Sequence, residues 1–138
     1  MAVNPTSDQI EQLVADAERL TGEVVMFNLL KFSETAGDGE GGTGQDSYGR
    51  YAATAIQKVT ERGGHVVWMG SPDSIIIGDD VVGDWDVVLL VSYPNRQAFL
   101  DMVGDPEYQA SHKHREGGLE RMALVAMTPG EGFGSTSG

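Results

Sequence analysis

Hydrophobic residues recur along this chain with two different spacings, and the wider spacing predicts its helices. Between residues 10 and 20, apolar side chains recur every three or four positions, with Ser7 as the expected N-cap and Gly22 after the last apolar position. A second stretch, residues 46–62, is expected to begin at its own cap, Asp46, and to end at Gly63. Both stretches predict amphipathic helices that pack on another element.

Four other segments predict strands, because they are rich in β-branched and aromatic residues. They are residues 23–32, 65–69, 85–93 and 121–127. Residues 24–30 and 87–91 are apolar at both odd and even positions, so both faces of these strands are expected to be covered. Residues 74–77 and 81–82 predict a hairpin or an extended arm between the second and third strands.

Two short helices are expected between the third and fourth strands. Asn95 is the predicted cap of the first, which runs to Met102. Asp105 is the predicted cap of the second, with Pro106 at its first position and Gly117 at its end.

The second of these helices carries Tyr108, His112 and Arg115 at offsets of four and three residues. A phenol, an imidazole and a guanidinium group are therefore expected to share one helix face. This combination is suited to holding a small polar or anionic ligand against a sheet.

Two segments have too little apolar surface to pack. Residues 33–45, "SETAGDGEGGTGQ", predict a Gly-rich mobile loop, either a lid or a solvated insertion. Residues 130–138 predict a disordered tail. The rest, residues 1–129, is expected to form a single domain.

Without its leading helix, the order of elements is β-α-β-β-α-β. This order predicts an α+β fold of the ferredoxin-like kind, with a four-stranded antiparallel sheet and helices on one face. Because the central strands are apolar on both sides, the face without helices needs a cover. A second copy of the chain is the most economical cover, which predicts a homodimer through the sheet face whose two sheets form a barrel.

Composition narrows the partners. The chain has 21 acidic and nine basic residues, a net charge of -12, so no nucleic-acid or membrane partner is expected. It has no cysteine for a disulfide or a thiolate ligand. The first residues lack the pattern of a signal peptide, and no apolar run reaches the ~20 residues needed to cross a bilayer. A cytoplasmic protein is expected.

Several motifs in sequence order carry a family resemblance. They are "NP" near the start, "VVMFNLLKF", "YGRY", "DWDVVLLVSYPNRQAFLDM" and "DPEYQASHKHREGGLE". From about residue 4 to 129 the chain resembles the domain-of-unknown-function family 1330, within the dimeric α+β barrel superfamily. The resemblance implies a ferredoxin-like protomer, a dimer through the sheet, and a small-molecule cavity between sheet and helices. It implies no particular activity, because the superfamily includes monooxygenases, haem-handling proteins, chlorite dismutases, isomerases and dehydrohalogenases.

Asn28 is the polar exception in the apolar first strand. A buried amide needs hydrogen-bond partners, which are either neighbouring protein groups or a ligand. If Asn28 faces the helices, then Met26 and Leu30 also do, whereas Phe27 and Leu29 face the second copy.

His112 and His114 are the candidate catalytic bases, but they lie about 200° apart around a helix, so at most one points inward. Periodicity favours His112, whereas the family resemblance draws attention to His114 with Arg115. A guanidinium at the inner edge of a helix needs a carboxylate, so Arg115 is expected to pair with an Asp or Glu of the protein or with a ligand.

Three aromatic residues complete the predicted ligand-binding set of Asn28 and Arg115. They are Tyr51, Trp85 and Tyr108, for which ordinary core packing is the competing explanation.

No metal or cofactor is expected. The two histidines of His112-Lys113-His114 are not four residues apart, and the aspartates of residues 79–86 lack calcium-loop spacing. A haem would need His112 or His65 as its axial ligand, and nothing around either residue selects it.

The predicted function is the binding of a small carboxylated or phenolic metabolite. One alternative is a cofactor-independent isomerase, lyase, dehydrohalogenase or monooxygenase, in which His112 or His114 takes a proton while Arg115 and Asn28 stabilise the anion. The other alternative is a structural dimer without a ligand.

Overall fold

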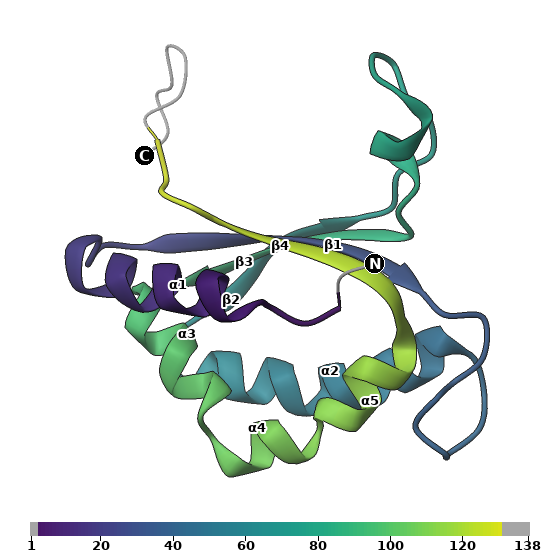
Figure 1. Ribbon diagram of the computed structural model, residues 1–138, viewed down its shortest axis with the longest axis horizontal. Coiled ribbons are helices and arrows are strands. Elements are labelled where there is room, and N and C mark those ends of the chain that lie inside the picture. Colours follow the sequence, from purple (N-terminus) through teal and green to yellow (C-terminus); the bar gives the residue numbers. More distant parts are fainter. Residues whose placement is uncertain (1–2, 131–138) are drawn as a thin grey trace.

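The sheet of this protein is covered by helices on one face only (Figure 1). The computed structural model describes residues 3–130. Its strands are β1 (Val24–Phe32), β2 (His65–Gly70), β3 (Val87–Tyr93) and β4 (Leu119–Met127), in the sheet order β2-β3-β1-β4 with antiparallel neighbours. Its helices are α1 (Ser7–Arg19), α2 (Gly44–Glu61), α3 (Arg96–Val103), α4 (Pro106–Ala110), α5 (His112–Gly118) and the short 3-10 helix η1 (Asp80–Gly83). The predicted α+β, ferredoxin-like order is confirmed.

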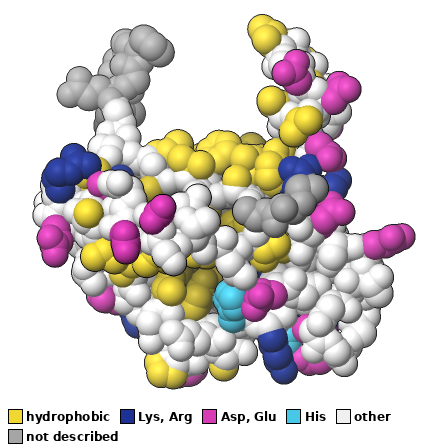
Figure 2. Space-filling model, viewed as in Figure 1, with side chains coloured by type: hydrophobic (Ala, Val, Ile, Leu, Met, Phe, Trp, Pro, Cys, Tyr) yellow, Lys and Arg dark blue, Asp and Glu magenta, His cyan; other side chains and the backbone are white. Residues whose placement is uncertain are grey.

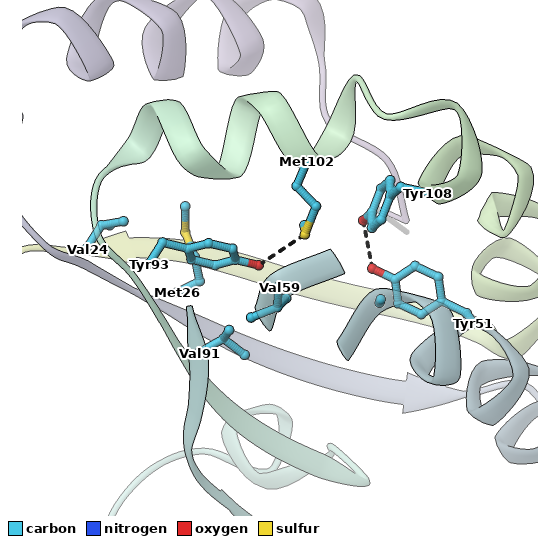
Figure 3. Close-up of a cluster of buried hydrophobic side chains, with 9 residues drawn as sticks. Val24, Met26, Tyr51, Val59, Val91, Tyr93, Met102 and Tyr108 are labelled. Atoms are coloured by element: carbon cyan, nitrogen blue, oxygen red, sulfur yellow. Dashed lines mark hydrogen bonds between the residues drawn. The ribbon is translucent and has the colours of Figure 1, made fainter. Parts of the chain in front are cut away.

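The helix side of the sheet forms the hydrophobic core (Figure 3). Met26 and Leu30 of β1 are 2% and 1% exposed, and Asn28 lies between them on the same face. The core cluster joins both central strands to α2, α3 and α4 through Val24, Met26, Val91, Tyr93, Tyr51, Ala55, Val59, Met102 and Tyr108. The predicted packing of the amphipathic α2 on the sheet is therefore observed.

The opposite face of the sheet, which we call the open face, carries apolar side chains without a cover. Phe27 pairs in register with Leu90 and Val125, and Trp68 pairs with the same Leu90. Trp68 and Val125 are 55% and 51% exposed. The strands are apolar on both sides, as the sequence predicts, and one of these sides is exposed in the single chain.

Two helices begin at residues other than the predicted caps. Thr6 caps α1 and Thr43 caps α2, each through a capping box in which the threonine hydroxyl and the side chain three residues later satisfy each other's backbone N–H groups. The predicted caps Ser7 and Asp46 are wrong, because Ser7 is the first helical residue and Asp46 is the partner that Thr43 requires.

The predicted helix over residues 105–116 is broken at Ser111 into α4 and α5. Asp105 and Pro106 begin α4 as predicted. The Ser111 hydroxyl donates to the Tyr108 carbonyl over 2.6 Å, in competition with regular helical hydrogen bonding. Tyr108 and Arg115 therefore lie on different helices rather than on one continuous face.

The segment between β2 and β3 is an extended arm and not a hairpin. Within residues 71–86 only η1 is regular, and the arm stands on the side of the sheet away from the helices (Figure 1). The predicted tail, residues 130–138, lies outside the described residues except for Gly130. No helix in residues 3–130 is long and apolar enough to span a bilayer.

Candidate functional site

Helices α2 and α5 meet so closely that only glycine fits between them. A Cβ atom added to Gly118 would lie 2.6 Å from the Gly44 carbonyl oxygen and 2.7 Å from the Tyr48 backbone nitrogen. The Gly117-Gly118 pair therefore does more than end a helix. It brings the polar residues of α5 against the start of α2 and the loop before it.

Arg115 of α5 is held by neutral groups. Its guanidinium donates to the Asn4 side-chain oxygen over 3.1 Å and to the Val3 carbonyl over 2.6 Å, and it lies against the sulfur of Met122 on β4. Among residues 3–130, no carboxylate oxygen lies within 4.0 Å of it. The carboxylate that the sequence predicts for Arg115 is therefore not supplied by this part of the chain.

His112 lies beside Arg115. Its Nδ1 atom is 2.9 Å from Glu116 Oε1, and its Nε2 atom is 3.4 Å from Arg115 Nη1. A carboxylate at Nδ1 favours the tautomer with its proton there, which leaves the Nε2 lone pair directed toward the guanidinium. Periodicity selects His112 as the histidine beside Arg115, and the structure places it there.

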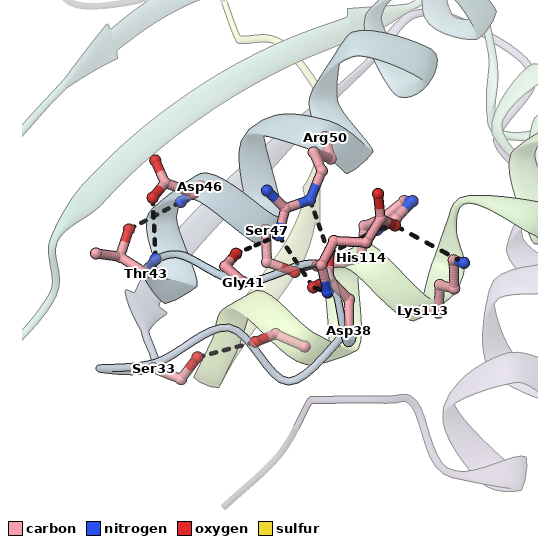
Figure 4. A network of polar contacts seen from close by, with 11 residues as sticks. Ser33, Asp38, Gly41, Thr43, Asp46, Ser47, Arg50, Lys113 and His114 are labelled. Carbon is pink, nitrogen blue, oxygen red and sulfur yellow. Dashed lines mark hydrogen bonds and ion pairs between the residues drawn. The ribbon is translucent and has the colours of Figure 1, made fainter.

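His114 lies in a different set of contacts, shown in Figure 4. Its Nδ1 atom is 2.7 Å from Asp38 Oδ2, and the same carboxylate accepts from Arg50 Nε over 2.8 Å and from Nη2 over 3.0 Å. The Asp38 side chain is 0% exposed and that of His114 is 16% exposed. We call Asp38, Arg50 and His114 the loop clamp, because they join the loop over residues 33–43 to α2 and α5.

The charges of the loop clamp are satisfied internally. The two hydrogen bonds from Arg50 hold the pKa of Asp38 well below its usual range, with smaller contributions from the Glu40 backbone N–H and His114. Asp38, Glu40 and His114 offer ligand atoms within 4.8 Å of one another. A cation at this cluster would have to displace Arg50, which contacts both oxygens of Asp38.

The backbone of the loop over residues 33–45 is also anchored. Gly37 N–H donates to the Gly117 carbonyl and Ser33 N–H donates to the Gly118 carbonyl, each over 2.9 Å. The loop therefore has defined contacts in this conformation, and its mobility stays a prediction.

Four aromatic rings form a row next to Arg115. The ring centroids of Phe32 and Tyr48, Tyr48 and Tyr51, and Tyr51 and Tyr108 are 5.6, 5.1 and 5.7 Å apart. The Tyr51 and Tyr108 hydroxyls share a hydrogen bond of 2.7 Å (Figure 3). Burial raises the pKa of Tyr48 to about 12, against a smaller lowering effect of the Arg115 charge. The guanidinium is thus close enough to act on these phenols.

Asn28 uses its amide nitrogen on the protein itself, donating to the carbonyls of Met26 and Leu89 over 3.1 and 3.2 Å. Its cross-strand neighbour on the same face, Leu124 of β4, is 43% exposed. The helices therefore do not cover this part of the sheet completely. Figure 2 shows apolar side chains in a hollow below α1, with a histidine and an acidic side chain at its rim.

Trp85 does not belong to this group. The Arg121 guanidinium lies 4.2 Å above the centre of its ring, and Arg121 pairs in register with Lys31, on the open face. Trp85 is therefore across the sheet from Arg115, at the base of the arm. The other predicted residues (Asn28, Tyr51, Tyr108, His112 and Arg115) lie on the helix side.

Sequence reasoning did not identify the loop clamp. Asp38 is one acid in a Gly-rich segment, and no motif in the sequence pairs it with Arg50. The cue that was available is the pair His114-Arg115, since neighbouring residues of a helix point in different directions and can serve two separate sites.

The fold and the site define a ferredoxin-like α+β protein with an arginine and a row of tyrosines between its sheet and its helices. Residues 42–128 match the model of the family described as Domain of unknown function (DUF1330), and the chain belongs to this family. The family resemblance seen in the sequence is confirmed. No curated protein matches the chain.

Solved structures agree with this assignment. The RPA0582 protein of unknown function from Rhodopseudomonas palustris is 30% identical, with a TM-score of 0.81 over 92% of this chain and 95% of its own. A Dabb family protein with a ferredoxin-like fold from Mesorhizobium loti is 14% identical, with a TM-score of 0.52 over 78% and 97% of the two chains. The Arabidopsis thaliana protein At3g17210 is also 14% identical, with a TM-score of 0.54 over 78% and 95%. The last two show a shared fold alone.

Proposed function

We propose that this protein binds a small anionic molecule, a carboxylate or a phenol with an acidic group, between its sheet and its helices. The observation that carries the proposal is the guanidinium of Arg115, which contacts only neutral groups among the described residues. A guanidinium and a carboxylate form paired, charge-assisted hydrogen bonds, so a ligand carboxylate suits this position.

Four of the other five arginines support this interpretation. Acidic residues outnumber basic ones by 21 to nine, so carboxylates are abundant for internal pairing. Arg19, Arg50, Arg62 and Arg121 each pair with an aspartate. Arg96 differs from them, since it is buried and its side-chain partner among the described residues is the Thr128 hydroxyl. Within the described residues, the charge of Arg115 is therefore free to pair with a ligand, next to the incompletely covered apolar surface around Leu124.

The neighbours of Arg115 suit a flat or phenolic ligand. Tyr48 and Tyr51 present ring faces for packing, and Leu124 presents exposed apolar surface across from Asn28. Asn4 and Val3 now accept from the guanidinium, and both lie on the segment that precedes α1. A ligand carboxylate would replace these neutral acceptors with a charged one.

Calorimetric titration with 4-hydroxybenzoate tests the proposal, with the neutral 4-hydroxybenzamide as the matched ligand. We expect binding of the acid only. Arg115→Gln should weaken it at least ~10-fold, because a hydrogen bond to a charged group contributes about 1.5–3 kcal/mol. Arg19→Gln is the control variant, since Arg19 is exposed on α1. Equal binding of both ligands, or unchanged affinity of Arg115→Gln, would contradict the proposal. If a panel of small acids bound nowhere, the chain would be a structural protein without a ligand.

We also propose that two copies associate through the open face. Its strand residues include Phe27, Leu29, Trp68, Leu90 and Val125, and the register places no Asp or Glu among them. In a chain of net charge -12, strands without an acidic residue on this face reduce the repulsion between two copies. Val125→Asp should convert a dimer into a monomer in analytical ultracentrifugation, and a dimer of unchanged affinity would contradict this interface.

Proton transfer by His112 is a second candidate function, favoured by its contacts with Glu116 and Arg115. In this role the Nε2 atom takes a proton from the carbon next to the carboxylate of a bound ligand. Arg115 stabilises the anion that forms. The test is incorporation of deuterium from heavy water into bound phenylacetate, followed by NMR. His112→Gln should abolish the exchange, while His114→Gln should not. Exchange that is absent in the wild type, or that persists in His112→Gln, would exclude His112 as the base.

A further inference from the structure

The arm over residues 71–86 exposes a concentration of large apolar side chains. Ile76 and Ile77 are 87% and 92% exposed, and Ile75, Val81 and Val82 are also exposed. In Figure 2 apolar side chains lie along the arm that rises from the sheet, together with acidic ones. A monomeric soluble protein rarely presents such a cluster unless it is a binding surface.

The arm has an internal structure. A Cβ atom added to Gly83 would lie 2.5 Å from Ile75 Cγ1, and one added to Gly78 would lie within 4 Å of both Ile75 and Val82. The 3-10 helix η1 is therefore folded against residues 75–78. An open hollow of about 520 Å³ lies between the two sides of the arm, lined by residues that include Pro72, Ile75 and Val81.

The base of the arm is anchored to the open face, which sets its direction. Asp84 pairs with Lys31 over 3.0 Å and with Arg121 over 2.7 Å, and Arg121 stacks on Trp85. The Asp86 carboxylate accepts from the Phe32 backbone N–H over 2.8 Å. These contacts hold the arm upright beside the exposed sheet face (Figure 1).

The sheet by itself offers a partner a surface of limited size. With strands about 4.8 Å apart and a rise of about 3.3 Å per residue, four strands of seven residues cover roughly 20 by 23 Å, or about 450 Å² in projection. A standard interface buries about 800 Å² on each partner. The apolar arm enlarges the surface that the same side of the molecule offers to a partner.

We propose that the arm is a clasp between two copies of this chain, in which Ile76, Ile77, Val81 and Val82 of each copy are buried against the other. This inference rests on the proposed homodimer and adds a specific device to it. A two-fold axis through the paired sheets relates two arms, so the arm of each copy packs against the other copy. Three aspartates of the arm beyond its base, Asp73, Asp79 and Asp80, remain at the solvated rim, where charged groups are common in interfaces.

Sedimentation equilibrium of the full chain tests the clasp. The variant Ile76→Asp/Ile77→Asp should raise the dimer dissociation constant at least ~100-fold, because two buried carboxylates would be left without partners. Ile56→Asp is the matched control, since Ile56 is an exposed isoleucine on α2, away from the arm. The control should dissociate like the wild type. If the double variant also dissociated like a dimeric wild type, the clasp would be wrong and the dimer would stand.

A wild type that remains monomeric at high concentration would overturn both the homodimer and the clasp. A second measurement uses the absence of native cysteine. An environment-sensitive dye on Ile77→Cys should shift its emission to the red when the protein is diluted below the dissociation constant. Emission that is independent of dilution would contradict burial in a second copy. Sedimentation of the monomeric protein together with phosphatidylcholine vesicles would assign the arm to a lipid surface and overturn the clasp.

Discussion

Arg50 and Arg115 lie on two helices that touch, yet their surroundings differ in one decisive respect. Arg50 makes two hydrogen bonds to the carboxylate of Asp38, whose side chain is 0% exposed. Arg115 contacts an amide oxygen, a carbonyl, an imidazole and a thioether. A satisfied ion pair ties the loop to the helices, whereas Arg115, which has no carboxylate partner in the described part of the chain, is the group that we propose for ligand binding. The difference separates a structural site from a candidate binding site.

The largest effect is expected from breaking the loop clamp. Asp38→Asn removes the charge that Arg50 and His114 share but keeps the shape of the side chain. The exchange rates of the Gly37 and Ser33 amides, which donate to α5 carbonyls, should rise at least ~10-fold because the loop opens locally. Hydrogen exchange by NMR measures this change.

Glu40→Gln is the control for this experiment. Its carboxylate is on the same loop but is 48% exposed, so the amide rates should stay near those of the wild type. Equal rates in Asp38→Asn and the wild type would show that backbone contacts hold the loop without the clamp.

The second largest effect is expected from low pH, which should open the loop clamp. Arg50 lowers the pKa of Asp38 in the folded protein below the reference value of 3.8, so the ion pair adds stability above that pH. This stability is lost as the pH falls from 3.8 through the lower folded pKa. We expect the amide shift of Gly37 to be constant from neutral pH down to about pH 4 and to change below it.

In Arg50→Gln the same transition should move to higher pH, since the main cause of the lowered pKa is gone. A transition at the same pH in both proteins would mean that groups other than Arg50 hold the carboxylate ionised. An NMR titration of the Asp38 side-chain carbonyl carbon distinguishes the two outcomes.

A smaller effect is expected from the buried phenols beside Arg115. Tyr51→Phe removes one partner of the 2.7 Å hydrogen bond between Tyr51 and Tyr108 and leaves the ring in place. The free energy of unfolding should fall by about 1 kcal/mol, since the Tyr108 hydroxyl loses its partner. Urea denaturation measures the change. An unchanged midpoint would mean that Tyr108 finds water or another acceptor.

The smallest effect on stability is expected from Arg115→Gln. A glutamine can still donate to the carbonyl of Val3 or the amide oxygen of Asn4, and no ion pair within the described chain is broken. The melting temperature should change by no more than about 1 °C, against the ~2–4 °C that 1 kcal/mol produces in a domain slightly larger than this one. A large loss would identify Arg115 as a structural residue and weaken the comparison with Arg50.

The secondary structure was predictable wherever burial follows a regular spacing. The four strands, the helices over residues 7–19 and 44–61, and the caps Asn95 and Asp105 agree closely with the sequence patterns. Errors occurred where local chemistry competes, as at Thr43 and at Ser111, whose hydroxyl ends α4. One polar side chain decides such a boundary, and periodicity does not detect it.

The candidate site was predictable only in part. The spacing placed Tyr108, His112 and Arg115 on one helix face, whereas Tyr108 lies on α4 and the other two on α5. All three still lie on the helix side of the sheet. Trp85 was predicted as one of the aromatic residues of the ligand-binding set, but it stacks with Arg121 on the open face. Asp38 was not identified, because its partner Arg50 is 12 residues away and the loop between them has no periodic pattern.

The sequence by itself determined the order of elements, the two apolar sides of the central strands and the acidic charge, because these depend on composition and short-range spacing. Only the tertiary structure decided that Arg50 has a carboxylate partner and that Arg115 has none among residues 3–130. That choice depends on a contact between a loop, α2 and α5 at the Gly117-Gly118 pair, which no local pattern encodes. Electrostatic pairing acts over a few ångströms in space, whatever the separation along the chain.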